Sequence, residues 1–191
     1  MDSAMRRLTF LVCIVLMLIT PLLAKLSEKL PLPDELRVGE LPWFALTARD
    51  EYGTFNDVIN RDSLKEIAKQ NNSERVIFAF FATWCIPCRE GLKLIGEKVT
   101  EFKGNEVLIV LVNVGEDDYG KISKWAEQYA KKEWLLGFDK YANLPEKFGL
   151  SKQGEDMPFP RTLVLDSNLR PLMLVGQEGD DYPQILWSVY E

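Results

Sequence analysis

The stretch that decides the fold runs from Val76 to Leu92 and reads VIFAFFATWCIPCREGL. Its first part, Val76–Ala82, is a continuous run of apolar residues, many of them β-branched or aromatic. A run of this length without polar alternation is typical of a central strand that is buried on both faces. Pro87 is tolerated in the first turn of a helix, where no backbone N–H is needed. The stretch therefore predicts a buried strand followed at once by a helix.

Two cysteines lie at the start of that predicted helix. Cys85 is expected at its N-terminus, where unpaired N–H groups and the helix dipole favour a thiolate and lower the pKa of the thiol below the roughly 8.5 of free cysteine. Cys88 lies nearly one turn further and faces the same way. Thiol–disulfide exchange needs one attacking sulfur and one resolving sulfur within bonding reach. We therefore predict that Cys85 attacks and Cys88 resolves.

Two structural roles compete with this chemistry. A zinc site needs about four Cys, His or carboxylate ligands. The chain has no His and only one further cysteine, Cys13, which lies in an apolar segment. The ligand count therefore disfavours zinc. An inert disulfide stays open, although a bridge between residues three apart constrains little of the unfolded chain.

Composition sets the class of the protein. A length of 191 residues with 47% hydrophobic content suits one compact domain with an appendage. The net charge of −6, without a basic cluster, argues against nucleic-acid binding through phosphates. The lack of His excludes Ser-His-Asp and Cys-His catalysis and His-ligated haem. We expect no metal and no cofactor other than the redox-active disulfide Cys85–Cys88.

The first 37 residues differ from the rest of the chain. Residues 1–24 combine Arg6 and Arg7 with the apolar run Leu8–Leu23, which is typical of a membrane-targeting segment. The run is short for a spanning helix of about 17–25 residues, so a cleaved signal peptide and a retained N-terminal anchor both stay open. Residues 25–37 mix charges with prolines and predict a linker. The domain itself is expected over residues 38–191.

Further hydrophobic patterns predict an alternation of strands and helices. The strand at 76–82, a helix reaching about residue 103 and a second apolar strand at 107–114 form the pattern of a right-handed crossover. A helix over 62–71, capped by Asp62 or Ser63, precedes them. The remaining predicted elements are a helix at 121–132, a short strand at 134–139, a short helix at 144–148, a hairpin of 161–166 with 171–176, and a closing helix at 182–190.

The dithiol segment resembles a known family. Trp84-Cys85-Ile86-Pro87-Cys88 after a Phe-rich strand resembles the active site of the thioredoxin superfamily, and ATWCIPCRE over 82–90 is similar to the exported TlpA/ResA-like thiol–disulfide oxidoreductases. The likeness extends from about Val38 to the C-terminus. It implies a thioredoxin-like α/β fold, with a central mixed β-sheet flanked by helices, an N-terminal extension and a central insertion.

The same resemblance assigns roles to residues outside the dithiol. The segment MPFPRTLVLD, residues 157–166, resembles the place where thioredoxin-like proteins carry a cis-proline that faces the dithiol. By this match Pro160 is expected to be cis, whereas a proline considered alone would be expected to be trans. The backbone of Phe159 is then expected to pair with an extended substrate segment. Trp84 is expected to join this substrate surface, with Ile86 and Pro87 in supporting roles.

The chain departs from the family where a proton-relaying acid is expected. Thioredoxins bury a carboxylate six residues before the first cysteine, where this chain has Ala79, and the TlpA/ResA relatives often place a glutamate six residues after it, where this chain has Gly91. Glu90 is one position away, rotated by about 100° on a helix. A solvent-facing role is the preferred interpretation of Glu90, and proton relay is the alternative. The acids at 116–118 are possible substitutes.

Three functions remain in competition. The resemblance implies a thiol–disulfide oxidoreductase in the cell envelope that reduces protein disulfides, in some relatives the haem-binding cysteines of apocytochrome c. Such an enzyme needs protein thiol or disulfide substrates and an upstream electron donor, which can be membrane-embedded. A thiol peroxidase is less compatible, because Thr83-Trp84-Cys85 lacks the Pro- and Thr-framed pocket of peroxide-reducing cysteines. A non-catalytic module that binds a partner through Trp84 and Phe159 is the third possibility.

Overall fold

The computed structural model describes residues 26–37, 39–50, 53–98, 107–176 and 179–188. Its strands are β1 (Lys29–Leu30), β2 (Ala45–Ala48), β3 (Asp57–Asn60), β4 (Arg75–Phe81), β5 (Val107–Val114), β6 (Leu135–Asp139), β7 (Arg161–Asp166) and β8 (Pro171–Val175). Its helices are the short 3-10 helix η1 (Asp34–Leu36), α2 (Arg61–Gln70), α3 (Ile86–Lys98), α4 (Tyr119–Tyr129), α5 (Asn143–Lys147) and α6 (Tyr182–Trp187).

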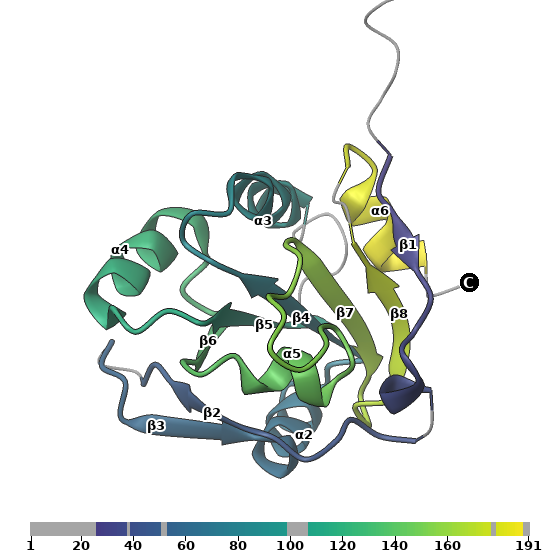
Figure 1. The fold of residues 1–191 in the computed structure, drawn as a ribbon, viewed down its shortest axis with the longest axis horizontal. Coiled ribbons are helices and arrows are strands. Elements are labelled where there is room, and N and C mark those ends of the chain that lie inside the picture. The colour runs from purple at the N-terminus through teal and green to yellow at the C-terminus, as the bar shows by residue number, and fades with distance from the viewer. Residues whose placement is uncertain (1–25, 38, 51–52, 99–106, 177–178, 189–191) are drawn as a thin grey trace, which may run out of the picture.

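The described strands form one mixed sheet in the order β1-β8-β7-β4-β5-β6-β2-β3 (Figure 1). Strands β4, β5 and β6 run parallel to one another, and β7 is antiparallel to β4. The helix α3 connects β4 to β5, so the predicted crossover is confirmed. Between β5 and β7 the chain adds α4, β6 and α5. The central mixed sheet flanked by helices is the predicted thioredoxin-like architecture.

Helices cover both faces of the sheet, which explains why β4 shows no polar alternation. Helices α3, α4 and α6 lie over one face, and α2 and α5 over the other (Figure 1). Successive side chains of a strand point to opposite faces, so both sets in β4 must be apolar. Both are buried: Val76, Phe78 and Phe80 pack on the α2 side, and Ile77, Ala79 and Phe81 on the α3 side.

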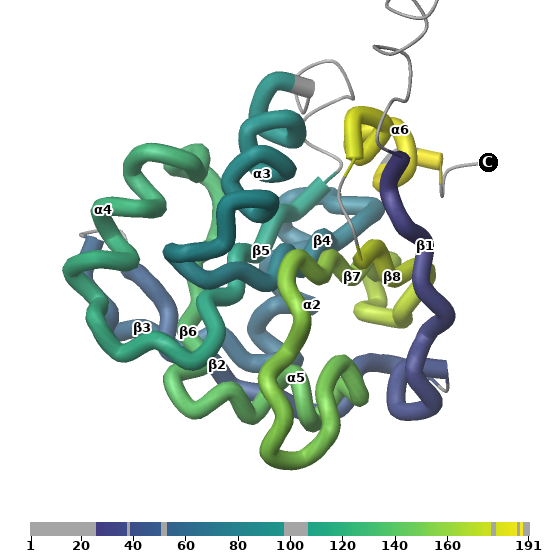
Figure 2. Tube along the Cα trace, turned by 45° about the horizontal axis from the view of Figure 1, so that its top comes forward, coloured from purple at the N-terminus to yellow at the C-terminus, as the bar shows by residue number. Residues whose placement is uncertain are grey.

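Strands from the N-terminal part of the chain form both edges of the sheet. Strand β1 pairs antiparallel with β8 along one edge, as Figures 1 and 2 show, and β2 pairs with β3 and β6 at the other. The prediction of a linker over 25–37 is corrected here, because the described part of it contains β1 and η1 and buries Leu36. A two-residue strand carries almost no sequence pattern, and its backbone bonds to β8 are what order it.

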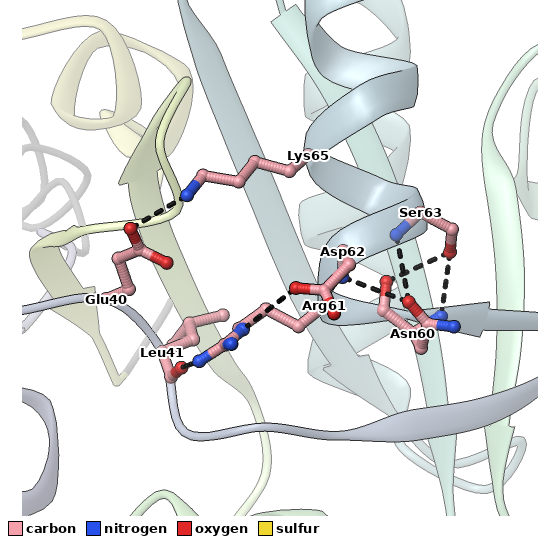
Figure 3. Close-up of polar contacts among 7 residues, drawn as sticks. All are labelled: Glu40, Leu41, Asn60, Arg61, Asp62, Ser63 and Lys65. Atoms are coloured by element: carbon pink, nitrogen blue, oxygen red, sulfur yellow. Dashed lines mark hydrogen bonds and ion pairs between the residues drawn. The ribbon is translucent and has the colours of Figure 1, made fainter.

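A capping box starts α2. The side chain of Asn60 accepts hydrogen bonds from the backbone N–H groups of Asp62 and Ser63, and the Ser63 hydroxyl accepts one from the Asn60 N–H (Figure 3). The cap is therefore Asn60, which lies two residues before Asp62 and three before Ser63, and the predicted cap was wrong by that amount. Two contacts fix the preceding segment to this helix: Lys65 Nζ lies 2.7 Å from Glu40 Oε1, and Arg61 Nη1 donates to the Leu41 carbonyl.

The remaining predicted boundaries agree with the structure to within about two residues, apart from helix ends. Helix α4 begins at Tyr119 and ends at Tyr129, three residues before the predicted end. The predicted end of α3 near residue 103, the end of the closing helix at 190 and the targeting segment 1–24 lie outside the described residues. In the part of the chain that the structure describes, no helix combines the length and apolar character needed to cross a membrane.

Candidate active site

The two cysteines lie where β4 gives way to α3. The chain turns through residues 82–84, and the Cys85 N–H donates a hydrogen bond to the Ala82 carbonyl over 3.0 Å. Since α3 begins at Ile86, Cys85 occupies its N-cap position and Pro87 lies in its first turn. The predicted helix start is confirmed. Burial of β4 on both faces fixes this turn in position.

A hydrogen bond singles out the sulfur of Cys85. The backbone N–H of Cys88 points at Cys85 Sγ over 3.2 Å. This is the bond that an N-cap side chain accepts from the third residue of a helix. A thiolate would gain more from it than a thiol, since a charged acceptor forms a stronger bond and the positive end of the helix dipole lies in the same place. The geometry therefore favours Cys85 as the nucleophile.

The sulfur of Cys88 has different surroundings. Cys85 and Cys88 form a disulfide with their Cα atoms 5.4 Å apart. Cys88 Sγ lies 4.0 Å from the Phe80 carbonyl oxygen, which carries partial negative charge. That neighbour disfavours a thiolate at Cys88 relative to Cys85. The geometry is compatible with the predicted division of roles, in which Cys85 attacks and Cys88 resolves, and that division stays a prediction.

The oxidised sulfurs lie just beneath an apolar surface. Cys85 and Cys88 are 3% and 2% exposed, whereas the residues on either side of Cys85, Trp84 and Ile86, are 65% and 57% exposed. A protein that approaches the disulfide must therefore contact Trp84 and Ile86. Such exposed apolar side chains beside a reactive group are typical of an interaction site.

Pro160 is at the same end of the sheet as the dithiol. The Phe159–Pro160 peptide bond is cis, as predicted. Strand β7 begins directly afterwards, and its first residue, Arg161, pairs with Phe80 near the end of the antiparallel β4. The start of β7 therefore lies beside the end of β4, which leads into the cysteines.

The aromatic residues predicted for substrate contact are brought together. The rings of Trp84 and Phe159 meet edge to face with centroids 5.4 Å apart. Phe159 is half-buried and packs against the core cluster that contains both cysteines. Two loops that are 75 positions apart in the sequence thus form one apolar surface over the dithiol.

Glu116 holds the turn that precedes Cys85. Its two carboxylate oxygens accept hydrogen bonds from the Thr83 N–H and from the Thr83 hydroxyl, both over 2.6 Å. Asn113 Nδ2 donates to the same carboxylate over 2.8 Å, and Lys121 Nζ lies 3.1 Å from it. From the sequence, Glu116 was only one of three acidic residues in a loop that were possible substitutes for the missing relay. A bond between residues 33 positions apart has no local pattern that could have singled it out.

The environment of Glu116 keeps its carboxylate charged. Burial would by itself raise the pKa of this group, but the hydrogen bonds from Thr83, Asn113 and Lys121 outweigh it and lower the pKa below its usual value. A carboxylate with a lowered pKa is a weak proton acceptor at neutral pH. Glu116 is therefore a positioning residue for the turn, and its geometry does not favour proton relay.

None of the three positions considered for a proton-relaying acid, 79, 90 and 91, places a carboxylate against the sulfurs. Ala79 is buried in the cluster that contains both cysteines, so the position of the thioredoxin carboxylate is apolar here. Gly91 is buried and has no side chain to contribute. Glu90 is exposed and lines a groove between α3 and α6, together with Gly179 and Asp180 from the segment that leads into α6. Its rotation about the helix explains this placement, and the geometry gives no support to a relay by Glu90.

The donor set for a metal is poor. Among the described residues, no group of three or more Cys, Asp or Glu side chains is placed to hold a metal ion. The expectation of chemistry without metal or cofactor stays a prediction.

Comparison with known proteins places this site in a family. The profile of the AhpC/TSA family matches residues 40–170, more than half of the chain. A curated relative, the thiol-disulfide oxidoreductase ResA of Geobacillus kaustophilus, is 30% identical over 88 residues, which cover 42% of this chain and 50% of the relative. The chain thus matches about half the length of that relative.

Solved structures show the same fold. A putative thiol:disulfide interchange protein DsbE from Chlorobium tepidum is similar with a TM-score of 0.58 and 20% identity, covering 78% of this chain and 91% of that one. A putative protein disulfide isomerase from Bacteroides thetaiotaomicron is similar with a TM-score of 0.60 and 17% identity, covering 85% and 93%. The thioredoxin-like fold is therefore shared across this group.

Because Glu116 is ionised, we predict that its contribution to the stability of the folded protein depends on pH. Glu116→Gln should lower the free energy of unfolding at pH 7 by about 1 kcal/mol, because charged acceptors form the stronger bonds. Since the folded-state pKa is lowered, the wild-type advantage is present above the ordinary Glu pKa of about 4.5 and disappears as the pH falls below it. Urea unfolding at pH 7 and through pH 5 to 3 measures this. Asp117→Asn, an exposed neighbour, is the matched control, and an equal effect of both variants would contradict the role of Glu116.

Proposed function

Because the chain belongs to the AhpC/TSA family and carries a paired dithiol on a thioredoxin-like fold, we propose that it is a thiol–disulfide oxidoreductase that reduces protein disulfides. The observation that carries the proposal is the hydrogen bond from the Cys88 N–H to Cys85 Sγ at the start of α3. It makes one sulfur the better thiolate while its partner is held within bonding distance. An inert structural bridge would need neither this asymmetry nor the exposed Trp84 beside it.

The exchange proceeds in two balanced steps. The Cys85 thiolate attacks one sulfur of a substrate disulfide, forming a mixed disulfide and releasing the other substrate sulfur as a thiolate. Cys88 then loses its proton and attacks Cys85 Sγ, which forms the Cys85–Cys88 disulfide and frees the second substrate sulfur. Two electrons pass from the protein to the substrate. An upstream dithiol donor must return them before the next cycle.

The segment ahead of the domain supports a location in the cell envelope. Arg6, Arg7 and the apolar run Leu8–Leu23 are typical of an export signal or anchor. An exported reductant works in an oxidising compartment, so its electrons must arrive from a donor at or across the membrane. The likeness to ResA over 88 residues supports an oxidoreductase of this kind. Within this proposal, apocytochrome c cysteines are one candidate substrate, carried over from the resemblance.

Substitution of either cysteine separates the two steps. Cys85→Ser should remove disulfide reduction above the uncatalysed background, since the nucleophile is gone. Cys88→Ser should still attack but stall, so that the mixed disulfide with its substrate accumulates. Non-reducing electrophoresis of cells expressing Cys88→Ser, followed by mass spectrometry, identifies the trapped partners.

The competing functions give different outcomes in these assays. Full biological activity of Cys85→Ser would contradict exchange and favour a non-catalytic binding module. Consumption of hydrogen peroxide by the reduced wild-type protein, faster than its exchange with disulfides, would favour a peroxidase. Cys13→Ser, outside the proposed site, is the control and should behave as wild type in exchange.

The direction of electron flow is tested by the reduction potential. A reductant of protein disulfides should equilibrate with glutathione at a potential near that of thioredoxin, about −270 mV. Mass spectrometry of alkylated samples across a series of glutathione ratios measures the fraction reduced. A potential near about −120 mV would mean that the protein oxidises dithiols, and the reducing direction would be wrong.

A further inference from the structure

A cavity lies beside the dithiol that the proposed exchange does not use. Its volume is about 230 Å³, and Trp84 and Phe159 form one wall. Val114 and Gly115, at the end of β5, line it as well. The cavity is therefore reached across the same aromatic surface that a partner must touch to approach Cys85.

The rim of this cavity carries negative charge. Glu116, Glu155 and Asp156 line it, and among the residues that the structure describes no Lys or Arg does. Glu116 is ionised and forms an ion pair with Lys121, which partly neutralises its charge. Glu155 and Asp156 are exposed, and neither forms an ion pair with another described residue. The loop that leads to Phe159 therefore carries two exposed acidic side chains, Glu155 and Asp156, without an ion-pair partner among the described residues.

The size of the cavity limits what it can hold. An α-helix with its side chains is about 10–12 Å across, too large for a space of about 230 Å³. A single long side chain fits better. The apolar wall of Trp84 and Phe159 suits the methylene stem of lysine or arginine, and the carboxylates suit the charged end, which is how such side chains pack at mixed surfaces.

We propose that this cavity binds a lysine or arginine side chain of the substrate polypeptide, close in sequence to the cysteine that Cys85 attacks. The inference rests on the proposed reduction of protein disulfides and narrows its substrates to disulfides flanked by basic residues. The acidic rim also repels disulfides flanked by Asp or Glu. The same rim therefore favours substrates with basic residues and disfavours those with acidic residues.

Rates of exchange with matched peptides test this. Three oxidised peptides, each with one internal disulfide, carry Lys, Ala or Glu on both sides of the cysteines and are otherwise identical. At about 0.05 M salt the reduced wild-type protein should reduce the Lys peptide about three- to tenfold faster than the Ala peptide, and the Glu peptide more slowly still. At about 1 M salt the difference should mostly vanish, because the charges are screened.

Variants on the rim and away from it give the matched comparison. Glu155→Gln with Asp156→Asn should reduce the Lys peptide at the rate of the Ala peptide. Glu90→Gln with Glu97→Gln removes the same charge from the groove between α3 and α6 and should keep the preference. Equal loss in both double variants would mean that net charge alone is responsible, and the cavity would not be the site.

A neutral reference separates this inference from the proposed function. Both of these double variants should reduce 2-hydroxyethyl disulfide, which has no charged side chain, at the wild-type rate. Reduction of that compound with no preference among the three peptides would overturn the basic-substrate inference and leave the oxidoreductase standing. If the wild-type protein reduces none of these disulfides, the proposed oxidoreductase function is wrong, and the inference that rests on it is wrong as well.

Discussion

The proposed chemistry of this protein depends on one contact, the hydrogen bond from the Cys88 N–H to Cys85 Sγ at the start of α3. It exists because Cys85 occupies the N-cap position, where the first N–H groups of a helix lack partners within the helix. The position of the helix depends in turn on β4, whose side chains are buried on both faces of the sheet. A strand held in this way fixes the position of the cysteines just beneath the surface at the end of the sheet.

The other parts of the site come from distant segments that the sheet brings to the same end. Because β7 is antiparallel to β4, its first residues, preceded by the cis Phe159–Pro160 peptide, lie beside the end of β4. Because β5 is parallel to β4, the loop after it places Glu116 next to Thr83. An apolar wall and an ionised carboxylate therefore meet at the dithiol although no two of these segments are adjacent in sequence.

The sequence predicted the features that have a local signal. The continuous apolar runs of β4 and β5, the helix at Pro87 and the cis Pro160 were all expected, the last from a family resemblance. It did not predict β1 or β3, because strands of two and four residues are defined by their partners. The Asn60 cap lay just ahead of the residues considered, and the clamp of Glu116 on Thr83 spans 33 positions. Glu90 is a candidate relay because it lies one position from the place where the TlpA/ResA relatives often carry a glutamate, but the rotation of α3 turns it outward.

The central claim, that the fold makes the Cys85 thiol more acidic than free cysteine, is tested most directly by alkylation. In a reduced protein carrying Cys13→Ser and Cys88→Ser, only Cys85 can react, and the N–H at position 88 is retained. The rate of reaction with iodoacetamide, followed by mass spectrometry against pH, reports the thiolate fraction. We predict a midpoint at least about one pH unit below that of free cysteine. A midpoint equal to or above that of free cysteine would contradict the account.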